Sequence, residues 1–209
     1  MTLASLLVPL VALILGHDAV VGERERNTLG LLLSLPVRRV EVILAKFIGR
    51  LLALAAAVGG GLGLAILVAS SEQRATLAAL VLPSLGLGAA FLSLGVLVSS
   101  LTRRQITAAS TAVALWFLLV IFYDLGLLAL MVATDGAVSQ DRIAALVTAN
   151  PVGLFRVQML SSLGSVSSLG DLGLSVAAGG SVVALLIWIA WTILPLSLSA
   201  LLIDRRGDR

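Results

Sequence analysis

The chain has 209 residues, of which 59% are hydrophobic and 12% are charged; its net charge is +3 and its mean hydropathy is +1.13. This apolar share is far above that of soluble domains, so the composition excludes an ordinary water-soluble domain. The absence of cysteine excludes a disulfide framework and a thiolate metal site. The composition therefore predicts an integral membrane protein of the all-α class, a polytopic bundle of transmembrane helices.

Four apolar runs are long enough to cross a bilayer, since about 20 apolar residues span a hydrocarbon core of roughly 30 Å. They cover residues 43–70, 77–101, 106–131 and 181–203. A fifth run, residues 1–16, is too short to span comfortably. It lacks the basic leader of a signal peptide and is followed by "ERER" and "VRR", so we expect it to be the second half of a membrane helix that begins before this chain.

Basic residues are concentrated in three of the connections. With the runs numbered in chain order, eleven of the fourteen arginines and lysines lie between the first and second runs or in the basic start of the second, between the third and fourth, or after the last. Short segments rich in Lys and Arg stay in the cytoplasm, so these three connections are predicted to share the cytoplasmic side. The pI near 10.5 follows from this topology, and a nucleic-acid partner is not needed to explain it.

The charges are densest between the first two runs, in "DAVVGERERNTLGLLLSLPVRRVEVILAK". The sequence predicts a solvated charged turn and then a short helix that Asn27 or Thr28 caps and Pro36 ends, within residues 23–36. One face of that helix carries Leu29, Leu32 and Leu33. A helix this short is marginal in water, so we expect its leucine face to contact the membrane surface and its charged end to contact a second protein.

The helix after Pro36 begins with basic residues that can reach the lipid phosphates of the inner leaflet. These predicted anchors are Arg38, Arg39, Lys46 and Arg50. Lys46 is the only lysine, and "LAKFI" around it lacks the glycine spacing of a phosphate-binding loop. The sequence therefore predicts no Walker ATPase site in this chain.

On the opposite side of the membrane, residues 139–163 predict two short helices. Ser139 can cap the first, and Asn150 followed by Pro151 is a typical start for the second. Apolar residues fall on one stripe of the second helix. We expect the two helices either to rest on the outer membrane surface or to offer a docking face to an external partner. The residues of that face are Asn150, Pro151, Phe155 and Arg156.

Several residues within the apolar runs have predicted structural roles. Pro83 and Pro195 should each kink a helix, because proline removes a backbone hydrogen bond. Small residues four apart commonly mark helix contacts in lipid; the examples here are Gly59 and Gly63 in one run, and Ser84 and Gly88 with Ala89 and Ser93 in the next. Asp124 lies far enough along its run that we expect a solvated helix end near the outer interface rather than a proton relay.

The charged stretch resembles the ABC-2 type permease family, whose members carry a pattern close to E-x-x-G-T-L-x-x-L-L-x-x-P-x-x-R, then G-K. Here it reads "ERERNTLGLLLSLPVRRVEVILAK", with Asn27 at the usual glycine position and Ala45 at the glycine before Lys46. Asparagine tolerates the left-handed conformation that glycine would supply, so the first departure is mild.

This resemblance implies helices two to six of a six-helix fold, with the first helix absent from the chain. It also implies that a separate ATPase subunit binds ATP and Mg²⁺, and that two permease chains, expected to be a homodimer, work in the cytoplasmic membrane with two ATPases. The residues that the motif assigns to ATPase coupling are Glu23, Arg24, Glu25, Arg26, Asn27, Thr28, Leu29, Leu32, Leu33 and Pro36.

Three further stretches, "HDAVVGERE", "NPVGLFRVQML" and "IAWTILPLSLSALLIDRR", are similar to family members that serve copper delivery to nitrous oxide reductase. That similarity implies a periplasmic partner protein. The chain itself shows no metal site, because its three methionines are scattered and it has one histidine. An ABC-2 exporter of drugs, lipids or glycans would carry the same features. A membrane scaffold would not need the charged stretch, and an intramembrane hydrolase would need a nucleophile motif such as G-x-S-x-G.

Overall fold

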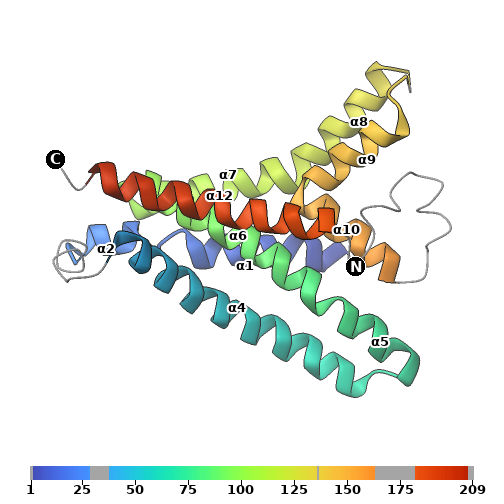
Figure 1. Ribbon diagram of the computed structural model, residues 1–209, viewed down its shortest axis with the longest axis horizontal. Helices are drawn as coiled ribbons and strands as arrows, with labels where there is room; N and C mark the ends of the chain where they lie inside the picture. The colour runs from blue at the N-terminus through green and yellow to red at the C-terminus, as the bar shows by residue number, and fades with distance from the viewer. Residues whose placement is uncertain (1, 29–37, 136, 163–181, 207–209) are drawn as a thin grey trace.

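The computed structural model describes residues 2–28, 38–135, 137–162 and 182–206, and the regular structure of these residues is helical. The long helices run side by side as an elongated bundle (Figure 1). The elements are α1 (Thr2–Gly16), α2 (Val21–Glu25), α4 (Arg39–Val68), α5 (Ser71–Ala79), α6 (Val81–Leu101), α7 (Gln105–Phe117), the π turn η1 (Leu118–Phe122), α8 (Tyr123–Ala133), α9 (Gln140–Ala149), α10 (Pro151–Ser162) and α12 (Val182–Arg206).

Within the described residues, five helical segments are long and apolar enough to cross a membrane, in agreement with the number of apolar runs. They are Leu3–Glu25, Val40–Val68, Gln73–Leu101, Gln105–Ala133 and Val182–Leu202, and are called here the first to fifth spans. The first span differs from the expectation. Because α2 follows α1 after a four-residue turn, the helical segment reaches 23 residues by length and composition, beyond the expected run of residues 1–16.

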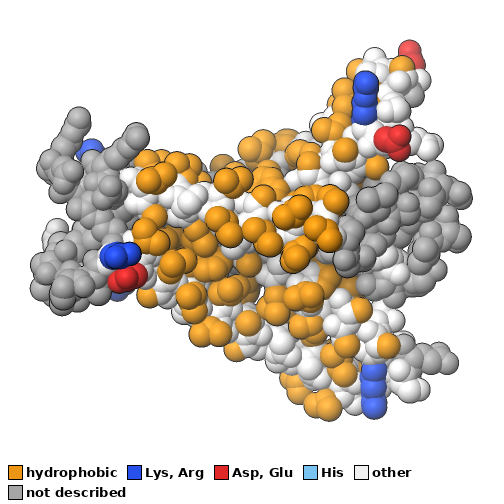
Figure 2. Space-filling view, viewed as in Figure 1, with side chains coloured by type: hydrophobic (Ala, Val, Ile, Leu, Met, Phe, Trp, Pro, Cys, Tyr) orange, Lys and Arg blue, Asp and Glu red, His pale blue; other side chains and the backbone are white. Residues whose placement is uncertain are grey.

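Helix α6 is the centre of the bundle and packs against α1, α12, α4, α10 and α7. The apolar window of its span is 61% buried within the chain, whereas those of the second and fourth spans are each 6% buried. These two spans therefore turn most of their apolar side chains outward. Figure 2 shows hydrophobic side chains along one whole face of the bundle, with charged ones toward its ends. This distribution suits a bundle surrounded by lipid.

The contact between α1 and α6 depends on two glycines. A Cβ atom on Gly16 would lie 2.8 Å from the carbonyl oxygen of Leu92, and one on Gly95 would lie 2.9 Å from the Cα of Gly16. The two backbones therefore touch without intervening side chains. The predicted role of Gly59 and Gly63 is wrong within this chain, because a Cβ atom on either would meet nothing within 4 Å.

The two prolines of the spans have different effects. Pro195 lies inside α12 and cannot donate to the carbonyl of Trp191, four residues earlier. The hydroxyl of Ser93 on α6 donates to that carbonyl at 2.9 Å, which compensates the lost bond. Pro83 lies in the first turn of α6, just after the break between α5 and α6 at Leu80. The third span, Gln73–Leu101, is thus interrupted three residues before this proline, which has no amide to donate to the carbonyl of Ala79. The predicted kink corresponds to this break.

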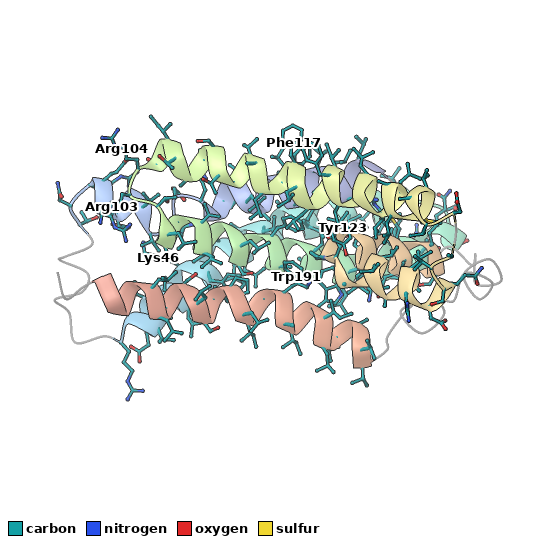
Figure 3. All side chains as sticks on the ribbon, turned by 90° about the horizontal axis from the view of Figure 1, so that it is seen from above. Lys46, Arg103, Arg104, Phe117, Tyr123 and Trp191 are labelled. Carbon is teal, nitrogen blue, oxygen red and sulfur yellow. The ribbon has the colours of Figure 1, made fainter. Side chains whose placement is uncertain are left out.

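The basic connections gather at one end of the bundle, as predicted. Lys46, Arg103 and Arg104 lie at the same end (Figure 3), which also holds α2, the start of α4 and the end of α12 (Figure 1). We call it the basic end. The connections between α4 and α5 and between α8 and α9 lie at the opposite end.

Helices α9 and α10 meet at an angle of 109° and together pass the length and composition test for a broken span; we call them the bent pair. Helix α10 packs against α6, α12 and α1, and Val152, Leu154, Phe155 and Val157 are all at most 2% exposed. The prediction that this helix rests on the outer membrane surface is therefore wrong. Its apolar residues lie on more than one stripe, and a helix that is apolar all round is buried.

Candidate functional site

Helix α2 is held in place by a serine of the central helix. The amides of Val20 and Val21 both donate to the hydroxyl oxygen of Ser99, each at 2.9 Å, and Ser99 is fully buried. The first amides of a helix need an acceptor, which a polar residue at the helix start usually provides. Val20 has no such oxygen, so Ser99 caps α2 from α6. The position of α2 therefore follows that of α6.

Two ion pairs join the region of α2 to α4. The Oε1 atom of Glu23 lies 2.9 Å from Nζ of Lys46, and Oδ1 of Asp18 lies 3.1 Å from Nη2 of Arg50. The Nε group of Arg50 also donates to the carbonyl of Leu15 at 2.7 Å. Lys46 and Arg50 are four residues apart and thus share one face of α4. The prediction that they anchor the chain to lipid phosphates is wrong in this structure, because both bind acidic side chains of the chain itself.

Helix α2 is also bonded to the turn between α6 and α7. The guanidinium group of Arg24 donates to the carbonyl of Thr102. The carboxylate of Glu25 accepts from the backbone amide of Gln105 at 2.8 Å. Gln105 is the first residue of α7, where a negative charge is favoured by the helix dipole. Three of the predicted coupling residues, Glu23, Arg24 and Glu25, are therefore tied to other elements, and the expected solvated turn is instead a short bonded helix.

Just after α2, Asn27 adopts a left-handed backbone conformation with φ of 56°. This is the conformation that asparagine tolerates in place of glycine. The next residue, Thr28, bonds back to Glu23: its amide donates to the backbone carbonyl at 3.0 Å and its hydroxyl to the carboxylate. The expected helix through Leu29, Leu32 and Leu33 to Pro36 falls outside the described residues, as does the side chain of Arg39.

Several arginines of the basic end stay exposed. Arg26 follows α2, and Arg103 and Arg104 form the turn between α6 and α7 (Figure 3). Arg38, one of the predicted lipid anchors, is exposed as well, and its backbone amide donates to the carboxylate of Glu41 at 3.1 Å. The basic end thus combines an internally bonded α2 with exposed positive charges beside it.

At the opposite end the predicted partner face is not presented as a surface. Asn150 is 2% exposed and Phe155 is 1% exposed, and Pro151 is also buried. Arg156 is half-exposed and forms an ion pair with Asp124 of α8. An external partner cannot reach the three buried residues in this arrangement. Asp124 is partly exposed and pairs with Arg156. The expectation that it marks a helix end is wrong, because the fourth span continues from it to Ala133.

Sequence reasoning did not identify two of the residues that fix the basic end, Ser99 and Asp18. Ser99 lies within an apolar run and resembles any other small packing residue. Asp18 precedes the motif, and its contact with Arg50 spans 32 positions of the chain. Lys46 and Glu23, by contrast, both belong to the motif stretch, so their pairing could have been suspected from it.

The fold and the charged end define a multi-pass α-helical membrane protein with a bonded short helix at its basic end. The chain belongs to the ABC-2 family of transporter proteins, because that family's model matches residues 2–207. It is 39% identical over 211 residues to the "Probable ABC transporter permease protein NosY" of Pseudomonas aeruginosa, covering 96% of this chain and 70% of that one. It is 37% identical over 217 residues to the protein of the same name from Stutzerimonas stutzeri, covering 98% and 78%.

The chain is therefore an ABC-2 permease subunit, similar to NosY, of an ABC transporter. Such a transporter has an ATPase as a partner of its permease. The subunits of this family are generally the non-catalytic membrane component.

Proposed function

We propose that the basic end receives the movement of a separate ATPase subunit and passes it to the helix bundle. The observation that carries this proposal is the bonding of α2 to three neighbours: Ser99 of α6, Lys46 of α4 and the amide of Gln105 at the start of α7. Packed helices shift as bodies between discrete arrangements. A displacement of α2 would therefore act on the second, third and fourth spans together.

The exposed arginines beside α2 suit the docking of the ATPase. Arg26, Arg103 and Arg104 present positive charge on the same end of the bundle, which fits an acidic surface. Charge complementarity at such a contact fixes the orientation of the two proteins more than it adds affinity. This assignment makes the basic end cytoplasmic and the protein a component of the cytoplasmic membrane, in agreement with its excess of Arg and Lys.

A charge exchange tests the role of the pair between Glu23 and Lys46. The chain has no cysteine, so spin labels can be placed at two introduced cysteines, one beside α2 and one in the bent pair. In the complex with its ATPase, Glu23→Lys should reduce the ATP-dependent change in the distance between the labels several-fold, because α2 is repelled from α4. The double variant Glu23→Lys/Lys46→Glu should restore most of that change.

Two results would count against this mechanism. The first is an undiminished distance change in Glu23→Lys, and the second is a double variant as defective as the single one. The exposed Arg26→Glu provides a matched control for docking. It should weaken co-purification of the ATPase, whereas the charge exchange should leave co-purification intact.

For the biological role we propose a function like that of NosY, in copper delivery to nitrous oxide reductase, with the chain acting as a homodimer beside a NosD-like periplasmic protein. The support is the similarity to two NosY proteins over nearly the whole chain. In this proposal the partners bind the copper, because the chain has one histidine, no cysteine and three methionines far apart in the sequence.

Complementation tests this role. A Stutzerimonas stutzeri strain that lacks its NosY should regain copper-loaded nitrous oxide reductase when it expresses this chain together with the ATPase that pairs with this chain. A reductase that stays without copper, while the complex assembles and hydrolyses ATP, would favour the alternative of an ABC-2 exporter of drugs, lipids or glycans.

A further inference from the structure

The fourth span contains a π turn that changes the hydrogen bonding of one carbonyl. In an α-helix the amide of Tyr123 would donate to the carbonyl of Leu119, four residues earlier. Here it donates to the carbonyl of Leu118, five residues earlier. The Leu119 carbonyl therefore lacks its α-helical donor, and a backbone carbonyl within a membrane span needs another partner.

Asn150, at the bend of the bent pair, supplies that partner. Its Nδ2 group donates to the carbonyl of Leu119 at 2.7 Å, and its Oδ1 atom accepts from the amide of Val152 at 3.0 Å. Asn150 is 2% exposed. One buried amide side chain thus caps α10 and holds the bent pair to the π turn.

Two more contacts join the bent pair to the residues directly after the π turn. The hydroxyl of Tyr123 donates to the carbonyl of Leu146 at 2.7 Å, and Asp124 pairs with Arg156. If the π turn rewound as an α-helix, α8 would rotate against α7 by about 100°, the angle that one residue takes in an α-helix. That rotation would carry Tyr123 and Asp124 away from the bent pair. These contacts can therefore form only while the turn keeps its π winding.

The bend itself is held from a third side. The indole of Trp191 on α12 donates to the carbonyl of Ala149 at 2.8 Å, and Trp191 and Tyr123 lie toward the same part of the bundle (Figure 3). The fifth span therefore fixes the residue next to Asn150, so that Asn150 can reach the fourth span.

We propose that Asn150 is a positioning residue that keeps the fourth span in its π winding while the bent pair is docked. The bent pair then undocks only when the span rewinds, so that the two movements form one two-state change. A local movement at this end thereby becomes a rotation of α8. The inference goes beyond the proposed function, because it requires neither the ATPase nor copper.

Hydrogen–deuterium exchange of the full chain in detergent micelles tests this inference. Asn150→Ser keeps an oxygen that can cap α10 but is too short to reach Leu119, and Asn150→Leu keeps the side-chain volume but loses both bonds. In both variants the amides of residues 118–124 should exchange roughly ten-fold faster or more. Thr148→Val is the matched control. Thr148 is buried in α9, two residues before Asn150, and its hydroxyl donates to the carbonyls of Ala144 and Ala145. Its loss should leave the exchange rates of residues 118–124 unchanged.

A second substitution tests whether the contacts act as one unit. Tyr123→Phe should speed exchange at the same residues, and combining it with Asn150→Ser should give less than the product of the two effects. Unchanged exchange at residues 118–124 in Asn150→Ser would overturn the proposal. It would also be overturned if the double variant sped exchange by the full product of the two single effects. Equally faster exchange in α1 and α6 would overturn it as well, because it would indicate a general loss of stability.

Discussion

At the scale of single residues, several hydroxyl and amide side chains provide hydrogen bonds that the backbone lacks at a helix start or break. Ser99 caps the start of α2, Ser93 binds the carbonyl left free by Pro195, and Asn150 binds the carbonyl left free by the π turn. In each case the donor and the acceptor belong to different helices. These bonds therefore fix how the helices are placed against each other as well as satisfying backbone groups.

Replacement of Ser99 should show this most clearly. Ser99→Ala leaves two buried amides, those of Val20 and Val21, without their acceptor, and an unsatisfied buried group costs about 1–3 kcal/mol. We expect a lower unfolding temperature for the purified protein in detergent. Ser84→Ala is the matched control, since the buried hydroxyl of Ser84 donates to the carbonyl of Leu80 in the preceding turn. Equal effects of the two substitutions would contradict the capping role of Ser99.

At the scale of whole helices, the packing of α6 explains why the bundle separates into a buried part and an outward part. Small residues on α6 let α1 and α4 approach it closely: Gly95 touches Gly16, and Gly88 faces the side chain of Leu54. The second and fourth spans lie at the edge of this core and turn most of their apolar side chains outward. Helix α10 fills the remaining space beside α6 and α12.

A pair of glycine substitutions tests this packing. Gly95→Ala places a Cβ atom 2.9 Å from the Cα of Gly16, so the helices must separate, and such overpacking typically costs about 1–3 kcal/mol. Gly60→Ala introduces a Cβ that meets nothing within 4 Å, and alanine favours a helix over glycine by up to about 1 kcal/mol. The unfolding temperature in detergent should therefore fall for Gly95→Ala and hold or rise for Gly60→Ala. A fall in both would show that the contact between α1 and α6 is not the cause.

At the scale of the whole molecule, the charge distribution separates the two ends of the bundle. Arg103 and Arg104 lie at the basic end with α2. At the opposite end Arg156 is paired with Asp124, and Arg142 belongs to α9. The basic end holds the exposed arginines beside α2, whereas the opposite end holds the bent pair. Under the proposed coupling, a change at the basic end would pass to the other end along the long helices between them.

Cysteine labelling in intact cells tests the orientation. In this cysteine-free chain, Arg142→Cys should react with a thiol reagent that does not cross the membrane, because α9 is at the end predicted to lie outside. Arg104→Cys should react only after the cells are opened, since its loop is rich in arginine. The reverse pattern would place α2 on the wrong side for an ATPase and would end the coupling proposal.

The sequence by itself determined the membrane class, the positions of the second to fifth spans, the common end of the basic connections and the left-handed Asn27. These are local properties: the length of an apolar run, the charge of a loop, or the backbone preference of one residue. The tertiary structure decided that Lys46 and Arg50 bind Glu23 and Asp18 instead of lipid, that α10 is buried, and that Ser99 and Asn150 complete the bonding of distant helices. These features depend on which helix faces which: the spacing of small residues marks α6 as a helix with close contacts, but it does not say which helix each of them meets.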